Sequence, residues 1–180
     1  MNQTELAVDF GATVDQKTSV IAKDLRLNLK RLIEQGTLTP QDAHLAILAV
    51  AAAVEYEPLK NYARHALAEF GFPAEQIAEA AESSAMMAML NVYYRFRHMV
   101  GNEEDYRVAG LRMTALARPT LGKTRFEMLA FALSVLNGCE SCIRSHEEVL
   151  RNEGFGTDKI HDLARLAAVV KALKTLSNTH

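Results

Sequence analysis

The sequence predicts an all-α protein: one compact helical domain with an internal two-fold repeat. Helix-forming residues, above all alanine, leucine, glutamate and arginine, dominate the chain, and runs of alternating β-branched residues are absent. Proline and glycine stand at intervals that suit the starts and ends of helices. Several of these boundary residues recur when the chain is shifted along itself by 83 residues.

The size of the chain is typical of one globular domain. It has 180 residues, of which 49% are hydrophobic, and this is enough to form an ordinary core. We therefore expect a single domain over residues 1–180. Residues 1–18 show no clear periodicity, and we expect them to form an N-terminal arm.

The helix boundaries follow in order from capping residues, proline and glycine. Ser19 is suited to cap the first helix, and Pro40 can occupy the first turn of the second, where its missing N–H is not needed. Pro119 cannot continue a helix and should stop the one before it. The expected helices run from Ser19 to Gly36, from Thr39 onward, from Pro58 to Gly71, from Pro73 to about Gly101, from about Asp105 to Arg118, from Gly122 to Leu136, from Cys139 to Glu153 and from Thr157 to about Leu176.

The internal repeat divides the chain into a first copy, residues 37–95, and a second copy, residues 120–178. At the offset of 83 residues Thr37 falls on Thr120, and the helix starts and stops of the two copies coincide. We interpret the copies as two helical hairpins that pack around a pseudo-twofold axis.

Composition argues against two classes of function. The net charge is −2 and the isoelectric point is about 6.3, so the chain does not present the basic surface that nucleic-acid binding requires. The longest apolar run, Leu45 to Val54, is far shorter than the roughly 20 residues that span a bilayer. The start of the chain has neither a basic nor an apolar leader segment. We expect a cytoplasmic protein with no membrane and no nucleic-acid partner.

The only two cysteines, Cys139 and Cys142, are three residues apart. In a reducing cytosol such a close pair is more often catalytic or metal-binding than structural. His146 continues the spacing, because positions i, i+3 and i+7 share one face of a helix. The three residues fall on positions without thiols in the first copy, so that copy is degenerate and the active site is expected in the second.

The start of the cysteine-containing helix favours redox chemistry. Asn137-Gly138 can adopt a left-handed turn that places Cys139 at the helix N-terminus, where free N–H groups and the helix dipole stabilise a thiolate. His146 lies one turn beyond Cys142 and can accept the proton of that thiol, directly or through a water. The dipole favours Cys139 as the attacking thiol and the histidine favours Cys142, so spacing leaves the order open.

Glu127 is the only charged residue in the apolar stretch Phe126 to Leu136. A general acid or base near the thiols would explain a carboxylate there, and a surface position on the helix is the alternative. His44 is its counterpart in the first copy, and we expect a hydrogen-bonded structural histidine. The thiols themselves have two alternatives, a zinc site completed by other histidines and an inert pair of core cysteines.

The motif E-x11-C-x-x-C-x3-H, formed by Glu127, Cys139, Cys142 and His146, resembles that of the alkyl hydroperoxidase D family. This family is part of the carboxymuconolactone-decarboxylase-like superfamily, and the resemblance, which includes the upstream YYRFRHM segment, covers nearly the whole chain. It implies a helical subunit with a duplicated core, assembled as a homotrimer. The aromatic and basic segment from Asn91 to His98 is suited to a subunit contact.

The resemblance also implies an antioxidant thiol–disulfide oxidoreductase that reduces alkyl hydroperoxides and regenerates a partner peroxiredoxin, alkyl hydroperoxidase C. Cys142 would be the peroxidatic nucleophile, which passes through sulfenic acid and forms the mixed disulfide with the partner. Cys139 would be proton donor and resolving thiol, and the Cys139–Cys142 disulfide would close each cycle. His146 and Glu127 would form the proton relay.

The resemblance implies no metal and no tightly bound cofactor. Electrons would come from dihydrolipoamide on a lipoylated 2-oxoacid dehydrogenase subunit, which lipoamide dehydrogenase recharges. One position departs from the family pattern, because Ser141 stands between the cysteines where a histidine is expected. A hydroxyl can pass a proton along but cannot hold a charge near neutral pH, so the direct peroxidase activity depends on a shorter relay.

Two other functions fit parts of this pattern. A lyase like carboxymuconolactone decarboxylase belongs to the same superfamily and needs no paired thiols. A non-enzymatic redox-sensing or zinc-binding module would use the same cysteines without turnover.

Overall fold

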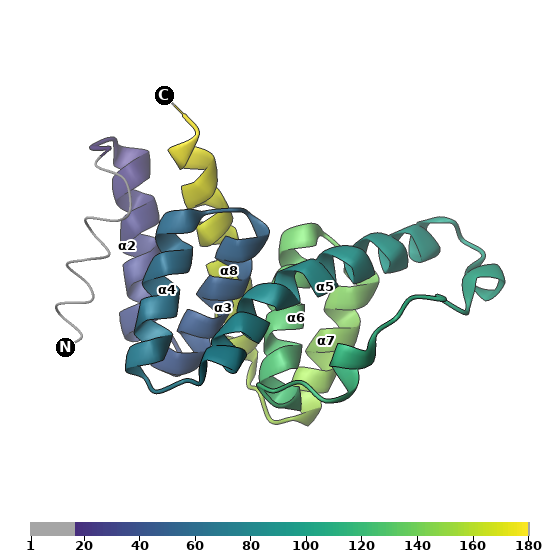
Figure 1. Ribbon diagram of the computed structural model, residues 1–180. Coiled ribbons are helices and arrows are strands. Elements are labelled where there is room, and N and C mark those ends of the chain that lie inside the picture. The colour runs from purple at the N-terminus through teal and green to yellow at the C-terminus, as the bar shows by residue number, and fades with distance from the viewer. Residues whose placement is uncertain (1–16, 180) are drawn as a thin grey trace.

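The computed structural model describes residues 17–179, and all the regular structure in this range is helical (Figure 1). The prediction of an all-α protein is therefore confirmed. The α-helices are α2 (Val20–Gln35), α3 (Pro40–Ala53), α4 (Glu57–Glu69), α5 (Ala74–Met99), α6 (Lys123–Asn137), α7 (Glu140–Asn152) and α8 (Thr157–Ser177), with two short 3-10 helices, η1 (Glu103–Tyr106) and η2 (Thr114–Ala117).

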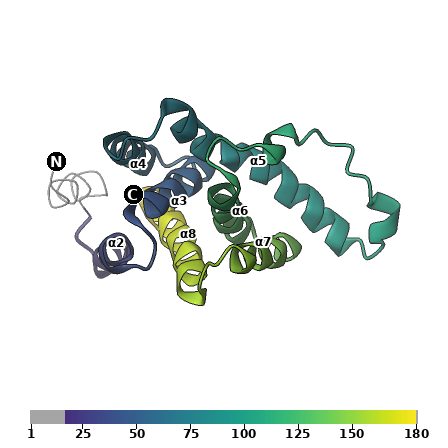
Figure 2. The same ribbon diagram turned by 90° about the horizontal axis from the view of Figure 1, so that it is seen from below.

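Helices α3 and α6 form the centre of the molecule. Residues 43–51 of α3 and 128–134 of α6 are all buried, as expected for helices that are apolar on every side. Helix α3 packs against α4, α5, α6 and α8, and α6 packs in addition against α7. The two central helices therefore carry the core, and the outer helices cover them (Figure 2).

Capping residues place the helix starts as predicted. Ser19 accepts a hydrogen bond from the amide of Ala22 at 3.2 Å, and Thr39 accepts one from the amide of Asp42 at 3.1 Å, directly before Pro40. These side-chain oxygens satisfy N–H groups that have no partner inside the helix. The boundaries of α2 and α3 therefore follow from local sequence.

The two halves of the chain share their helix boundaries. Helices α3, α4 and α5 begin at positions 40, 57 and 74, and α6, α7 and α8 begin at 123, 140 and 157, which is 83 residues later in each case. The turn after each central helix contains a left-handed residue at the same offset, Glu55 with φ 55° and Gly138 with φ 64°. These coincidences support the proposed repeats, residues 37–95 and 120–178.

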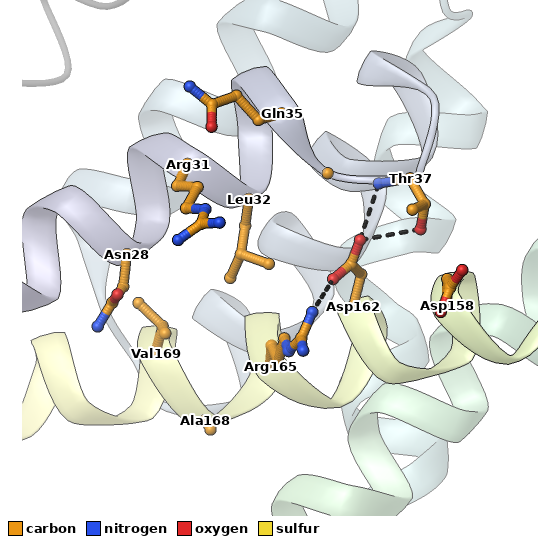
Figure 3. Close-up of a pocket in the computed structure, with 11 residues that line it drawn as sticks. Asn28, Arg31, Leu32, Gln35, Thr37, Asp158, Asp162, Arg165, Ala168 and Val169 are labelled. Atoms are coloured by element: carbon orange, nitrogen blue, oxygen red, sulfur yellow. Dashed lines mark hydrogen bonds and ion pairs between the residues drawn. The ribbon is translucent and has the colours of Figure 1, made fainter.

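Each half also holds the start of the other half. The amide and hydroxyl of Thr37 donate to Oδ2 of Asp162 at 2.8 and 2.9 Å, while Arg165 donates to Oδ1 at 3.0 Å (Figure 3). At the offset of 83 residues, Thr120 donates in the same way to the carboxylate of Glu79, at 2.9 and 2.8 Å. The two contacts are reciprocal, and we name them the threonine clamps.

The Asp162 clamp is more buried than the Glu79 clamp. Asp162 is 3% exposed, at one end of a groove of about 550 Å³ between α2 and α8. Burial alone would raise the pKa of Asp162, but the bonds from Thr37 and the ion pair with Arg165 outweigh it and lower the pKa. Asp162 is therefore a buried carboxylate that depends on its partners.

Replacing Asp162 by asparagine should lower the free energy of unfolding by about 1–3 kcal/mol, because a charged acceptor is lost and buried donors lose part of their pairing. Chemical denaturation measures the change. Glu79→Gln is the matched comparison, since it removes the charge of the more exposed clamp and should destabilise less. Equal losses in both variants would show that burial does not set the strength of the clamps.

The predicted helix from Asp105 to Arg118 is wrong. The segment contains only η1 and η2, joined by a non-helical stretch in which Gly110 has φ 64°. Residues such as Val108, 81% exposed, find no packing partner within the protomer, so tertiary contacts do not compensate for a glycine inside the helix. In both views the second half of α5 and this segment extend beyond the other helices (Figures 1 and 2).

The expected N-terminal arm, residues 1–18, lies almost entirely outside the described residues. Lys17 is described, and its ammonium group donates to the carbonyl of Leu176 at 2.9 Å. Among the helices of residues 17–179, none is both long enough and apolar enough to cross a bilayer.

Candidate active site

The turn between α6 and α7 brings the cysteines to the start of a helix. Gly138 ends α6 in the left-handed conformation, with φ 64° and ψ 38°, which a glycine adopts without steric penalty. The amide of Cys139 donates to the carbonyl of Ser134 at 3.2 Å, and Cys139 is the N-cap of α7. Cys142 therefore lies in the first turn, where amide N–H groups lack intrahelical partners.

The structure joins Cys139 and Cys142 in a disulfide, with their Cα atoms 5.3 Å apart. The two sulfur-bearing residues differ in access. Cys139 is completely buried, and Cys142 is 7% exposed. Only Cys142 of the pair lines a cavity that is described below. An external reagent would therefore meet the sulfur of Cys142 first.

Glu127 and His146 form a pair that connects α6 to α7. Nδ1 of His146 lies 2.6 Å from Oε2 of Glu127, and each side chain is about one fifth exposed. The carboxylate fixes the orientation of the ring, so that the other ring nitrogen is left for a second partner. In the disulfide form, no hydrogen bond among residues 17–179 joins this ring to either sulfur.

A cavity of about 260 Å³ lies beside Cys142 and His146. It brings together three parts of the chain that are distant in sequence, namely α5, the segment around η2 and the first two turns of α7. The cavity is large enough to hold several waters. The thiol and the imidazole therefore share one solvent-filled space, through which a proton can pass.

A buried polar network supports the turn, and the sequence reasoning missed it. Asn91 is fully buried and donates to the hydroxyl of Ser134 at 2.9 Å, while its own oxygen accepts from Asn137, also at 2.9 Å. Arg95, one turn further along α5, donates to the carbonyl of Asn137 at 2.6 Å. The i, i+4 spacing of Asn91 and Arg95 was the available signal.

The first repeat has a different pair at this place. His44, the counterpart of Glu127, is 3% exposed, with Nδ1 2.6 Å from the carbonyl of Pro40 and Nε2 3.1 Å from the hydroxyl of Tyr62. Burial lowers the pKa of His44, although the hydrogen bond to Pro40 opposes this. His44 is thus the hydrogen-bonded structural histidine that the sequence predicted.

The free energy of unfolding should decrease as the pH falls below about 6.5, the ordinary pKa of histidine, because of His44. Its pKa is lowered in the folded state, so the unfolded chain binds more protons in this window and acid favours unfolding. The stabilisation is complete above pH 6.5 and is lost as the pH falls through the window. Denaturation of His44→Gln at several pH values should show a flatter dependence, whereas His65→Gln, at an exposed histidine, should leave it unchanged.

Among residues 17–179, no three histidine, cysteine, aspartate or glutamate side chains are grouped closely enough to hold a metal ion.

Comparison with known proteins identifies relatives of the chain. Residues 105–178 match the model of the carboxymuconolactone decarboxylase family. A protein named alkyl hydroperoxide reductase AhpD from Anaeromyxobacter dehalogenans is 44% identical over 154 residues, which cover 84% of this chain and 81% of that protein. A protein of the same name from Rhizorhabdus wittichii is 41% identical over 160 residues, which cover 88% of this chain and 91% of that protein.

The helical fold and the matching family model define a protein of the carboxymuconolactone decarboxylase class. Within that class, the chain belongs to the AhpD family of alkyl hydroperoxide reductases, which are oxidoreductases. The family resemblance inferred from the cysteine motif is thereby confirmed.

Proposed function

We propose that this protein is a thiol-dependent reductase of alkyl hydroperoxides, with Cys142 as the attacking thiol. The observation that carries the proposal is the asymmetry of the disulfide, because Cys142 lines the cavity with His146 while Cys139 is completely buried behind it. A peroxidatic thiol must meet its substrate, and a resolving thiol need only reach the first sulfur.

One turnover then uses the residues as follows. His146, held by Glu127, takes the proton of Cys142 through a water in the cavity. The thiolate attacks the peroxide, the O–O bond breaks, and the organic product leaves as an alcohol after protonation, so that Cys142 becomes a sulfenic acid. The thiol of Cys139 attacks this sulfur, water leaves, and the disulfide forms.

We propose dihydrolipoamide as the electron donor, carried on a lipoylated 2-oxoacid dehydrogenase subunit and recharged by lipoamide dehydrogenase. The partner on the oxidant side is a peroxiredoxin of the alkyl hydroperoxidase C type, reduced through a mixed disulfide at Cys142. The position of Cys142 at the cavity supports both exchanges, since each requires an accessible sulfur. No tightly bound cofactor enters this scheme.

Ser141 occupies the position between the cysteines, with its oxygen 3.7 Å from Sγ of Cys139. It also lines the cavity. A hydroxyl at this place can pass a proton to Cys139 or to the departing product, which supports a relay of Glu127, His146 and the serine.

We propose that the protein acts as a cytoplasmic homotrimer. The outer face of α5 and the segment after it expose several large apolar side chains, and exposed apolar patches of this kind mark association surfaces. They are Val92, Phe96, Met99, Val100, Tyr106 and Val108. Light scattering of the purified protein should give the molar mass of three chains.

Reconstitution tests the function. The protein is mixed with NADH, lipoamide dehydrogenase, lipoamide and an alkyl hydroperoxide, and the loss of NADH is recorded; an oxidised peroxiredoxin replaces the peroxide in a second series. NADH should be consumed only when this protein and an oxidant are both present. A protein that is fully reduced to the dithiol but consumes neither oxidant would refute the proposal.

A further inference from the structure

The cavity beside Cys142 has two chemically different sides. The α7 side is polar and reactive, and it consists of Ser141, Cys142, Ser145 and His146. The opposite side has no charged group among the described residues and consists of Met87, Leu90, Tyr94, Met113 and Leu116. A ligand that fits both sides has a reactive polar end and an apolar tail.

The apolar side comes from two elements. Met87 and Leu90 are almost fully buried on α5 and form a fixed wall. Met113 and Leu116 come from the segment around η2, which is otherwise mostly exposed, yet both side chains turn inward and are only partly exposed. An isolated 3-10 turn has little intrinsic stability, so these inward contacts serve to hold the segment over the cavity.

Size restricts the ligand. The volume of about 260 Å³ lies below the range of roughly 300–1,000 Å³ that is typical for pockets of drug-sized ligands. It exceeds what hydrogen peroxide alone would fill, since a water occupies about 30 Å³ in the liquid. A short unbranched chain satisfies both limits, whereas a folded peptide segment does not.

We propose that this cavity binds a short aliphatic chain whose reactive end points to Cys142, and that Met113 and Leu116 select for that chain. The inference rests on the proposed function and names the substrate feature that its site recognises. Two reactants can carry such a chain: an n-alkyl hydroperoxide, which oxidises the dithiol, and a dithiol donor with a chain like that of dihydrolipoamide, which reduces the disulfide.

Both reactants use the same sulfur. The hydroperoxide delivers an oxygen to Cys142 and leaves as an alcohol, and Cys139 then expels water to form the disulfide. The dithiol donor attacks Cys142, so that the S–S bond breaks and Cys139 leaves as a thiolate that takes up a proton. The second donor thiol then attacks the donor sulfur of the mixed disulfide, which releases Cys142 and the oxidised donor.

The test measures chain-length dependence in each half-reaction separately. In the first arm, the reduced protein is mixed with hydrogen peroxide and with ethyl, butyl and hexyl hydroperoxides. In the second, the disulfide form is mixed with dithiothreitol and with dihydrolipoamide. For the arm in which the cavity holds the chain, the rate constant should rise about two- to fourfold per methylene group, as expected from burial of apolar surface.

Leu116→Ala should reduce this preference, expressed as the ratio of the hexyl hydroperoxide rate constant to that of hydrogen peroxide, or of dihydrolipoamide to dithiothreitol. Leu116→Met keeps the volume and should preserve the ratio. Val108→Ala is the matched control, because Val108 belongs to the same segment but is exposed and does not line the cavity. The molar mass of each variant shows whether the assembly is unchanged.

The outcomes separate the inference from the proposed function. A loss of preference in the first arm assigns the chain to the hydroperoxide, and a loss in the second assigns it to the donor; either supports the inference. Turnover of hydrogen peroxide with no chain preference in either arm would overturn the inference and leave the proposed function intact. Absence of any Cys142-dependent oxidation would refute the proposed function itself.

Discussion

Replacement of Cys142 by serine should abolish both peroxide turnover and disulfide exchange with a peroxiredoxin. A serine hydroxyl is far less acidic than a thiol and cannot form a disulfide, so neither the attack nor the mixed disulfide is available. The remaining thiol, Cys139, is completely buried and does not line the cavity, so it should not take over the reaction. The NADH-coupled assay and a titration of thiols lost per peroxide added measure the effect.

Cys139→Ser is the matched control, because it removes the resolving thiol and leaves the attacking one. This variant should consume one equivalent of peroxide and stop, with a sulfenic acid on Cys142 that a dione reagent traps and mass spectrometry locates. The reverse pattern, with single turnover in Cys142→Ser and none in Cys139→Ser, would assign the attack to Cys139.

Glu127→Gln should lower the peroxide turnover rate by about 10²- to 10⁴-fold, the range for loss of general acid–base catalysis. The glutamine has nearly the same volume, but it lacks the charge that holds the ring of His146 through the 2.6 Å contact with Nδ1. The rate at which iodoacetamide alkylates Cys142, measured against pH, should shift to higher pH, because a less well-oriented imidazole accepts the thiol proton less readily.

The control for this prediction is Glu148→Gln, since Glu148 is exposed on α7 and lies near the same helix turn as His146. It removes the same charge from the surface and should change the turnover rate less than twofold, in keeping with a screened surface charge. An unchanged alkylation profile in Glu127→Gln would remove Glu127 from the relay.

Local sequence was sufficient for those parts of the fold that depend on local interactions. The caps Ser19 and Thr39 and the left-handed turn at Gly138 could be read directly, because capping and glycine conformations involve residues only a few positions apart. The spacing of Cys139, Cys142 and His146 likewise required only helical periodicity.

The parts that escaped prediction depend on contacts between distant residues. Asn91 and Ser134 are 43 positions apart, and nothing in either segment indicates that a buried amide meets a buried hydroxyl. The segment from Asp105 to Arg118 contains enough apolar residues to suggest a helix, but Met113 and Leu116 turn toward the cavity while Val108 remains exposed. Such choices are made by tertiary packing, which overrides propensity.

The threonine clamps bear on how a duplicated chain keeps a copy that has no thiols. Thr37 is held by Asp162 and Thr120 by Glu79, so each half supplies the anchor on which the other half begins. Deleting the first half would leave the catalytic half without its anchor and with its central helix uncovered. A protein built in this way cannot shed its inactive copy, because that copy acts as the internal chaperone and permanent mould of the active one.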